Sequence, residues 1–237
     1  MMIKNVDEKE RIVRVYERRK RTIQSDLYSC FDPANFFIIQ KRDSEVLILL
    51  KKIGFTLLKD KRILDVGCGI GDELRNFIRY GALPENLCGV DLLSDRVEIA
   101  KKISPNIDFR CGDASKLPYE DESFDIVLQY TVFTSILDRQ MKKGIAGEML
   151  RVLKPNGIIL WYDYHMNNPK NPDVKGVRKK EIYELFPHCQ IYLKCITLAP
   201  PITRLIAPYS YLACYLLEKL KIFNTHYLGI IKKGETV

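Results

Sequence analysis

The sequence has seven cysteines, but no two of them stand in a CxxC spacing. Zinc sites built on thiolates need such close spacing, so the pattern argues against zinc, and the spacing of a radical cluster-binding motif is absent as well. The odd cysteine count, with Cys68, Cys88 and Cys111 inside apparent strands, predicts buried free thiols rather than disulfides. We therefore expect a cytoplasmic protein without a metal site.

The sequence also lacks an apolar leader and a long uninterrupted apolar run. Residues 1–21 are highly charged, which predicts neither a signal peptide nor a membrane anchor. The most apolar segment, 198–223, contains prolines at 200, 201 and 208 and so cannot form one spanning helix. It forms either a lid, a membrane-surface patch aided by Lys219 and Lys221, or a helical insertion packed on the rest of the fold. We favour the packed insertion.

The net charge of +8 is distributed unevenly. Residues 1–25 contain eight basic and four acidic residues, residues 175–237 contain ten basic and four acidic residues, and the stretch between them is slightly acidic. Basic ends are compatible with an anionic partner such as nucleic acid, a phosphorylated substrate or a membrane surface. A solvated lysine-rich surface explains the same charges, and we favour that interpretation.

Short apolar strands alternate with amphipathic stretches through most of the chain. The predicted strands are 62–66, 87–91, 107–112, 124–130, 157–164, 189–197 and 226–233. The predicted helices are 7–24, 36–53, 72–80, 94–102, 138–153 and 178–186. Alternating strands and helices imply right-handed crossovers with helices on both faces of a sheet. The expected fold class is therefore α/β: a doubly wound, seven-stranded, mostly parallel Rossmann-like sheet with N-terminal helices and a helical insertion before the last strand.

The stretch "ILDVGCGIG" places Gly67, Gly69 and Gly71 directly after the first predicted strand. Parallel sheets bind ligands at the carboxyl ends of their strands, and glycine lets a ligand approach the backbone closely. Asp91 ends the next strand, where an acidic residue can accept both hydroxyls of a ribose. This combination predicts a cofactor that contains adenosine.

The two residues after the glycines narrow the choice of cofactor. A dinucleotide fingerprint calls for a small residue where this sequence has Asp72, followed by Glu73. Carboxylates in the first turn of a helix would repel a pyrophosphate. They are compatible with a cationic ligand that carries no phosphate, and S-adenosylmethionine is such a ligand.

Four segments in order resemble the class I S-adenosylmethionine-dependent methyltransferases. They are "ILDVGCGIG", "GVDLLSDRVEIAKK", "GDASKLPYEDESFDIVLQYTVF" and "EMLRVLKPNGIILWYDY". The resemblance covers residues 63–164 and is nearest to the type 11-like branch that methylates small molecules. It implies a single domain over 1–237, with an N-terminal helical cap (1–55), a cofactor-binding core (56–165) and an acceptor-side region of loop, last strands and helical insertion (166–237).

The resemblance also implies which residues bind the cofactor. These are Asp65, Gly67, Gly69, Gly71, Asp91, Leu92, Asp113, Ala114 and Gln129. The glycine backbone would approach the methionine portion, and Asp65 would order that loop. Asp91 would hold the ribose, Leu92 would pack on the adenine, and Asp113 would accept a hydrogen bond from the adenine amino group. The backbone of Gln129 would contact the methionine amino group.

The sequence excludes some methyl acceptors. The segment 129–135 lacks the Asn/Asp-Pro-Pro-aromatic motif of the enzymes that methylate exocyclic amines. No Pro-Cys follows the fourth predicted strand, which argues against methylation of a cytosine carbon through a thiolate. We therefore expect in-line methyl transfer to oxygen or nitrogen of a small-molecule acceptor.

Candidate acceptor-side residues follow the fourth and fifth predicted strands. His165 has an ordinary pKa near neutrality, which suits a catalytic general base, although a surface histidine would look the same in the sequence. Asp163 and Tyr164 precede it and are candidate substrate-binding residues, and Tyr130 and Phe133 are candidate walls of the acceptor site.

Other residues have weaker signals. Tyr28 and Phe36 are candidates to cover the cofactor from the N-terminal helices. Arg42 either reaches the methionine carboxylate or is a solvated helix arginine, and we favour the solvated arginine. His188 and His226 are interpreted as structural.

Two other functions compete with a small-molecule methyltransferase. An RNA methyltransferase would use the basic ends, but no appended RNA-binding domain is evident and nucleic acid is not the expected partner. A non-catalytic S-adenosylmethionine-binding partner would retain the same cofactor motifs. Peripheral membrane contact is not the expected state, and the sequence leaves the oligomeric state and the identity of the acceptor open.

Overall fold

The computed structural model describes residues 7–22, 28–168 and 171–234. The strands are β1 (Ile63–Val66), β2 (Leu87–Asp91), β3 (Asp108–Cys111), β4 (Phe124–Tyr130), β5 (Leu153–Tyr164), β6 (Gln190–Leu198) and β7 (Asn224–Lys232). The α-helices are α1 (Glu8–Thr22), α2 (Pro33–Lys52), α3 (Asp72–Arg79), α4 (Ser94–Ile103), α5 (Arg139–Val152), α6 (Lys179–Leu185), α7 (Pro200–Ile206) and α8 (Tyr211–Lys219).

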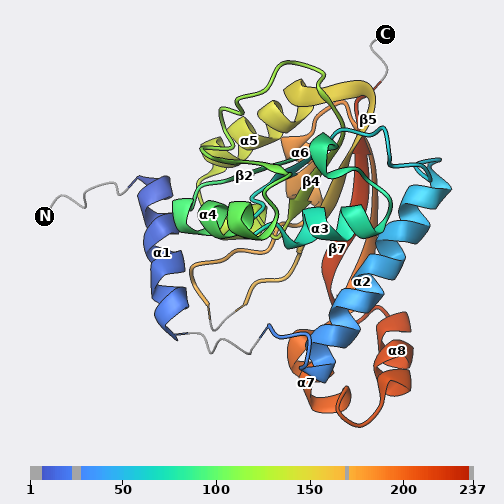
Figure 1. Cartoon of the computed structure of the whole chain (residues 1–237). Coiled ribbons are helices and arrows are strands. Elements are labelled where there is room, and N and C mark those ends of the chain that lie inside the picture. Colours follow the sequence, from blue (N-terminus) through green and yellow to red (C-terminus); the bar gives the residue numbers. More distant parts are fainter. Residues whose placement is uncertain (1–6, 23–27, 169–170, 235–237) are drawn as a thin grey trace, which may run out of the picture.

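All seven strands form one sheet in the order β3-β2-β1-β4-β5-β7-β6 (Figure 1). Neighbouring strands from β3 to β5 run parallel, whereas β7 runs antiparallel to both β5 and β6. The strand order reverses beside β1, so the carboxyl ends of β1 and β4 mark the crevice where open α/β sheets bind ligands. The predicted fold class, a doubly wound and mostly parallel seven-stranded sheet, is confirmed.

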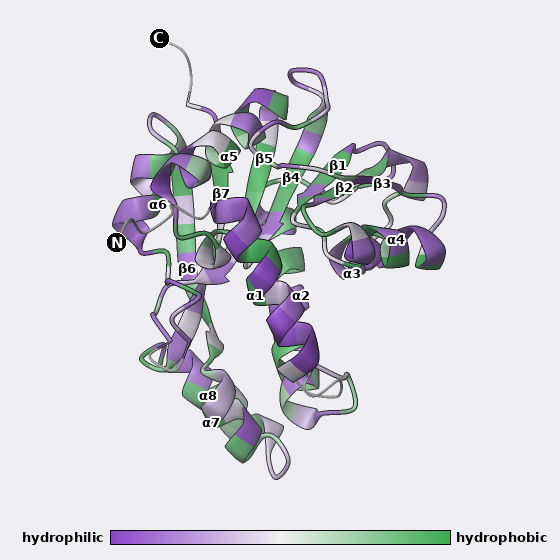
Figure 2. Cartoon of the chain, turned by 90° about the vertical axis from the view of Figure 1, so that its left-hand side faces the viewer, coloured by the Kyte–Doolittle hydropathy of each residue, from purple (hydrophilic) through white to green (hydrophobic). Residues whose placement is uncertain are grey.

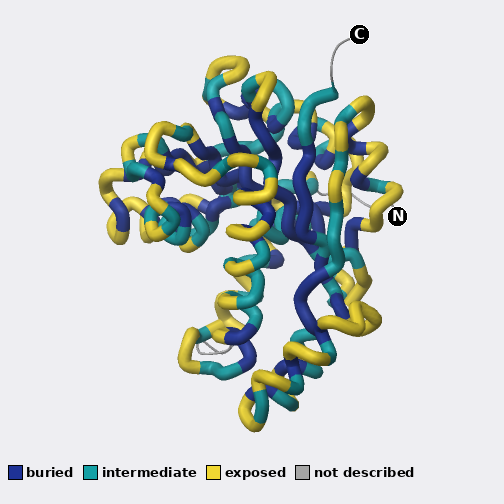
Figure 3. The backbone as a smooth tube through the Cα atoms, turned by 90° about the vertical axis from the view of Figure 1, so that its right-hand side faces the viewer, coloured by how far each residue is buried: buried dark blue, intermediate teal, exposed yellow. Residues whose placement is uncertain are grey.

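Side chains that alternate along the strands form a separate apolar core on each face of the sheet. Leu64 and Val66 pack on one face with residues of α1, α5 and α6. Ile63 packs on the other face with residues of α2, α3 and α4. Figure 3 shows the buried strands at the centre of the molecule. Because both faces are covered, the central strands are apolar at nearly every position.

The helix α2 begins three residues before the predicted start at Phe36. The Asp32 side chain accepts a hydrogen bond from the backbone N–H of Asn35 at 2.8 Å, and Pro33 occupies the first helical position. An aspartate cap followed by proline initiates a helix, so the Asp-Pro pair is the helix start rather than a separate turn.

Two further expectations need correction. The strand predicted over 157–164 begins earlier, because β5 starts at Leu153, which already pairs with Phe124 before the register shifts. All seven cysteines are free, as predicted, but Cys111 is exposed whereas Cys68 and Cys88 are buried. Cys111 lies on β3, which is an edge strand and has one side open to solvent.

The helices α7 and α8 stand at the carboxyl edge of the sheet, beside the N-terminal part of α2 (Figures 1 and 2). A small third core joins them to α2 through Ala34, Phe37, Leu198, Ala207 and Cys214. Within the described parts of the chain, no helix has both the length and the apolarity to span a bilayer.

Glycine-to-alanine changes at two positions test how tightly the sheet is packed. A Cβ at Gly229 on β7 would lie 2.2 Å from the carbonyl oxygen of Tyr192, whereas a Cβ at Gly147 on α5 would meet no atom within 4 Å. We expect Gly229→Ala to lower the free energy of unfolding by about 1–3 kcal/mol. Gly147→Ala should raise it by about 0.5–1 kcal/mol, because alanine favours the helix. Urea unfolding of both variants measures the difference, and equal stabilities would contradict this packing.

Candidate functional site

The turn after β1 is shaped by three glycines in the left-handed region, with φ values of +76° at Gly67, +54° at Gly69 and +86° at Gly71. A Cβ at Gly67 would lie 2.4 Å from Cγ2 of Val132, and one at Gly71 would lie 2.6 Å from Cζ of Phe109. Two of these positions therefore require glycine for space as well as for conformation. The turn brings the backbone against the ends of β3 and β4 and leads into α3.

The carboxylate of Asp91 fixes this turn to the end of β2. Its Oδ2 accepts the backbone N–H of Gly69 at 2.8 Å, and its Oδ1 accepts the backbone N–H of Leu93 at 2.9 Å. Each carboxylate oxygen can accept more than one hydrogen bond, so a ligand hydroxyl can still bind here. The acidic residue predicted from its spacing thus lies directly against the glycine turn.

A hollow opens above this turn, and we call it the glycine hollow. Its lining includes the backbone or side chains of Gly67, Asp91, Leu92, Asp113, Ala114, Tyr130, Val132, Ile12 and Tyr16. Six of these were predicted site residues: Gly67, Asp91, Leu92, Asp113, Ala114 and Tyr130. The other eight predicted site residues are not in its lining: Asp65, Gly69, Gly71, Gln129, Phe133, Asp163, Tyr164 and His165.

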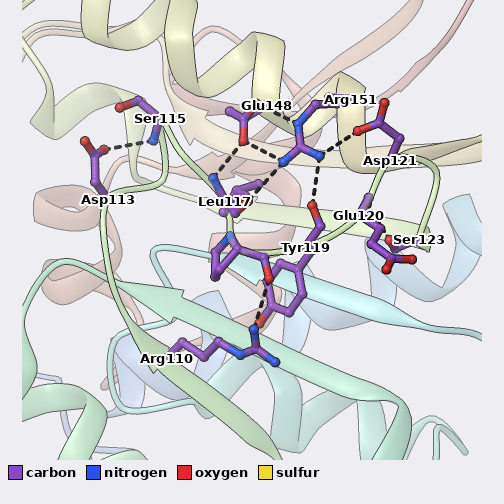
Figure 4. A network of polar contacts seen from close by, with 11 residues as sticks. Arg110, Asp113, Ser115, Leu117, Tyr119, Glu120, Asp121, Ser123, Glu148 and Arg151 are labelled. Atoms are coloured by element: carbon purple, nitrogen blue, oxygen red, sulfur yellow. Dashed lines mark hydrogen bonds and ion pairs between the residues drawn. The ribbon is translucent and has the colours of Figure 1, made fainter.

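The loop after β3 carries Asp113 and Ala114 and is held in place by α5 (Figure 4). Arg151 on α5 donates to the backbone oxygens of Leu117 at 3.0 Å and Tyr119 at 2.8 Å. Glu148, one turn earlier, accepts the backbone N–H of Leu117 at 2.7 Å. Asp113 accepts the backbone N–H of Ser115 at 2.8 Å. The sequence interpretation did not identify Glu148 and Arg151 as the residues that shape this loop.

The helix α1 closes one side of the glycine hollow. Lys9 forms an ion pair with Asp113 at 2.6 Å, and the Tyr16 hydroxyl lies 3.1 Å from Oγ of Ser135. Ile12 and Tyr16 line the hollow directly. Tyr28 and Phe36, the residues predicted to cover a cofactor, are not in its lining. Helix α1 covers the hollow instead. Its contacts join residues that are more than a hundred positions apart in the sequence.

Most of the positive charge of α1 is balanced by carboxylates of the described chain. Its ion pairs are Lys9–Asp113, Arg11–Glu8, Arg14–Glu10, Arg18–Asp173 and Lys20–Asp95. All of these cations except Arg11 are exposed, so the helix presents a solvated basic surface whose charge is largely neutralised.

Arg42 is buried beneath the site, contrary to the expectation of a solvated arginine. Its guanidinium pairs with Glu73 at 2.7 Å and lies over the ring of Tyr130 at 5.1 Å and the ring of Tyr162 at 5.6 Å. Position 42 points inward because α2 packs its apolar stripe on the sheet. Asp43 pairs with the guanidinium as well, at 3.1 Å, and aromatic rings with two carboxylates can hold a buried guanidinium, which is weakly hydrated.

The carboxylates of the first turn of α3 have partners. Asp72 pairs with Arg75 at 2.5 Å, and Glu73 pairs with Arg42. Asp65 is 2% exposed, and no described residue donates a hydrogen bond to its side chain. Burial and the neighbouring carboxylates of Glu73 and Asp91 raise the pKa of Asp65 well above its usual range. A cationic ligand would therefore stabilise the ionised carboxylate of Asp65. The carboxylates of Asp72 and Glu73 already have arginine partners.

A row of aromatic rings continues from the glycine hollow along the carboxyl edge of the sheet. The ring centroid of Tyr162 lies 5.5 Å from that of Tyr130 and 4.6 Å from that of His226, and His226 lies 3.7 Å from Tyr164. Burial lowers the pKa of His226 to about 3, so its imidazole is neutral. Two-residue periodicity puts Tyr162 and Tyr164 on one face, and antiparallel pairing of β5 with β7 brings His226 beside them.

Three predicted site residues lie in the packed interior. Phe133 and Gln129 are fully buried, and the Phe133 ring packs on Trp161 at 4.8 Å. Asp163 is also buried and accepts hydrogen bonds from the hydroxyl and, at 3.2 Å, the backbone N–H of Thr134. Burial raises the pKa of Asp163 to about 6, although the bonds from Thr134 lower it in part. Asp163 thereby positions the loop after β4.

His165 lies apart from the glycine hollow. Its Nε2 is 3.0 Å from the carbonyl oxygen of Asn224 and 3.2 Å from Sγ of Cys195, and its ring stacks on Tyr227 at 4.4 Å. Burial lowers its pKa. The histidine lines a second hollow with Arg178 and other cations, which we call the basic hollow.

Comparisons with known proteins agree with this geometry. Residues 64–161 match the family model described as "Methyltransferase domain". The chain is 35% identical over 113 residues to a phthiotriol/phenolphthiotriol dimycocerosates methyltransferase of Mycobacterium ulcerans, which covers 47% of this chain and 40% of that protein. It is 32% identical over 144 residues to a sterol 4-C-methyltransferase of Caenorhabditis elegans, which covers 56% of this chain and 39% of that protein.

Solved structures share the fold. An S-adenosylmethionine-dependent methyltransferase structure from Methanosarcina mazei superposes with a TM-score of 0.58 at 19% identity, covering 78% of this chain and 98% of that one. The chain spans about half or less of the length of the curated relatives it matches.

Replacement of Asp91 tests the site. We expect Asp91→Ala to weaken binding of S-adenosylhomocysteine by about 1–3 kcal/mol, because the ribose loses a charged acceptor and the glycine turn loses its anchor. Asp95→Ala is the matched control, since Asp95 lies on α4 and pairs with Lys20 on the surface. Calorimetry measures both affinities, and the wild type should not bind nicotinamide dinucleotides. Unchanged affinity in Asp91→Ala would contradict this assignment.

The buried carboxyl of Asp163 predicts a pH dependence of stability. Its pKa is about 6 in the folded chain and near 3.9 in the unfolded chain, so the folded state retains a proton that the unfolded state loses between these values. The wild type should therefore lose about 2 kcal/mol of stability relative to Asp163→Asn as the pH rises from 4 to 6. Urea unfolding across this range measures the difference, and parallel pH profiles would contradict it.

Proposed function

We propose that the chain is a class I S-adenosylmethionine-dependent methyltransferase that transfers a methyl group from S-adenosylmethionine to oxygen or nitrogen of a small apolar molecule. The observation that carries the proposal is the glycine hollow with Asp91 and Asp113 at its wall, which continues into the row of Tyr130, Tyr162 and Tyr164. Polar groups suited to an adenosine thus adjoin a surface suited to an apolar acceptor.

The residues present fit the cofactor. Gly67 lines the hollow, so a ligand can approach its backbone closely, and Asp65 offers a buried carboxylate to a cationic group. In the proposed arrangement Asp91 accepts the ribose hydroxyls, Leu92 packs on the adenine, and Asp113 accepts from the adenine amino group. Ala114 lies beside Asp113 at the same wall.

The remaining assigned residues complete the proposed cradle. Gly67, Gly69 and Gly71 carry the backbone past the methionine portion, and the backbone of Gln129 faces its amino group. S-adenosylmethionine supplies an electrophilic methyl group on a sulfonium, so the chain contributes alignment of the acceptor and exclusion of water. The helix α1 serves the second purpose, because it covers the hollow with Ile12 and Tyr16.

The aromatic row would align the acceptor. Tyr130 contributes to the hollow itself, and Tyr164 is partly exposed at the end of the row. Phe133 and Asp163 support this edge from within, since Asp163 holds Thr134 in the loop after β4. His165 faces the basic hollow instead. We therefore propose catalysis by alignment, without a contribution from His165 as a base.

The small apolar acceptor is consistent with two relatives, whose names refer to phthiotriol dimycocerosates and to a sterol. An RNA acceptor has less support, because the cations of α1 are paired with carboxylates. The direct experiment incubates the protein with methyl-labelled S-adenosylmethionine and pooled metabolite and lipid extracts. Label should enter an extractable small molecule with equal formation of S-adenosylhomocysteine. Label in RNA alone, or no transfer despite cofactor binding, would contradict the proposal.

Replacement of His165 decides between alignment and base catalysis. We expect His165→Ala to keep cofactor affinity and methyl transfer within severalfold of the wild type, because the side chain lies outside the glycine hollow. A loss of about 100-fold or more that shrinks at high pH would instead identify a general base. The pH profile of kcat in both proteins distinguishes the two.

A further inference from the structure

The helix α8 has several of its large apolar side chains on the outside, although Leu217 packs against the third core. Cys214 and Glu218, one turn apart, face the interior, with exposed fractions of 0% and 5%. Three leucines also follow one another at intervals of four residues, but they face the solvent. Their exposed fractions are 68% for Leu212, 57% for Leu216 and 59% for Leu220. A helix that only packs on the protein core has the opposite arrangement.

The buried carboxylate explains how α8 stays folded this way. Oε1 of Glu218 accepts the backbone N–H of Thr197 at 2.9 Å, and its Oε2 lies 4.0 Å from Nζ of Lys41. The carboxylate that faces inward is hydrogen-bonded through Oε1 only, because Oε2 has no hydrogen-bond partner among the described residues. The leucines that face outward belong to none of the three apolar cores of the described residues, and Ile222, 72% exposed, extends them. We call Leu212, Leu216, Leu220 and Ile222 the outer apolar face.

The charges around this face have one sign. Residues 199–223 contain a single carboxylate, which is the buried Glu218. Lys219 and Lys221 are exposed, and neither forms an ion pair with any residue in the described ranges. Exposed charge next to the leucines is thus positive.

The basic hollow adjoins the outer apolar face, because Ile222 belongs to both and the neighbouring Lys221 lines the hollow as well. Its volume is about 580 Å³, and Arg178, Lys179 and Lys180 line it from the start of α6. None of these three cations pairs with a carboxylate of the described chain.

The carboxylates of α6 are turned away from this hollow. Glu181 pairs with Lys142 at 2.7 Å, and Glu184 pairs with Arg139 at 2.6 Å, both on α5. The helix therefore presents cations on one side and neutralised carboxylates on the other. The hollow is suited to anionic groups such as phosphates.

We propose that the outer apolar face and the basic hollow together dock the protein on an anionic lipid bilayer. Leucines beside lysines match the boundary between acyl chains and anionic headgroups. A second copy of the chain fits less well, because a symmetric contact would bring Lys219 and Lys221 against the same lysines.

The position of the docking surface matters for access to the sheet. The segment with α7 and α8 leaves β6 at Leu198 and enters β7 at Asn224, where Tyr164 pairs with the adjacent His226. The surface therefore lies at the carboxyl edge of β5, the edge that also carries the glycine turn (Figure 1). A docked molecule would present this edge to lipid. Docking itself does not depend on methyl transfer.

Sedimentation with vesicles tests the proposal. The full chain is mixed with two kinds of vesicle. One contains phosphatidylcholine alone, and the other contains phosphatidylcholine with about 30% of the anionic lipid phosphatidylglycerol. We expect binding to the anionic vesicles that weakens with salt. Two double variants should each lower partitioning of the protein onto the anionic vesicles by at least ~10-fold. One is Leu212→Asp with Leu216→Asp, and the other is Lys219→Glu with Lys221→Glu.

Matched controls exclude general effects of charge. Lys101→Glu/Lys102→Glu makes the same charge change on exposed positions of α4, and Leu57→Asp makes the same change at a leucine that is 82% exposed elsewhere. Both controls should bind vesicles like the wild type, and circular dichroism should show that every variant is folded. No binding by the wild type, or equal loss in the controls, would overturn the proposal. So would a dimer in analytical ultracentrifugation that the leucine variants abolish.

Discussion

The carboxylate of Asp91 is the contact on which the rest of the site depends. It accepts backbone N–H groups from Gly69 and Leu93 and so joins the turn after β1 to the end of β2. The turn packs closely against Phe109 and Val132 because its glycines have no side chain, and a Cβ at two of them would clash with these residues. One carboxylate therefore sets the position of the glycine backbone, and the glycines set the shape of the hollow above it.

The surrounding charges follow from that arrangement. Several carboxylates gather near the turn, and Arg42 and Arg75 neutralise Glu73 and Asp72. Asp65 stays buried with a raised pKa. Such a site gains from a ligand that brings positive charge and loses from one that brings a pyrophosphate. Helix α1 and the loop tied to Arg151 then enclose the hollow from two sides.

The strand–helix alternation was enough to predict the sheet and its fold class, because buried parallel strands are continuous apolar runs. Local spacing was also enough to place Gly67 and Asp91 together, and the family resemblance added Asp113. The cover by Ile12 and Tyr16 could not be predicted, since it depends on where α1 docks. The burial of Arg42 and the aromatic row depend on packing between distant segments in the same way. His165 follows β5 directly, but the twist and pairing with β7 direct it to the other hollow.

Backbone amide chemical shifts during titration with S-adenosylhomocysteine test the central claim most directly. If the glycine hollow holds the cofactor, the largest changes occur at Gly69, Leu93 and Ala114, with smaller changes along α1 where Ile12 and Tyr16 cover the site. Changes confined to the basic hollow around His165 and Lys179, with Gly69 and Ala114 unaffected, would contradict the account.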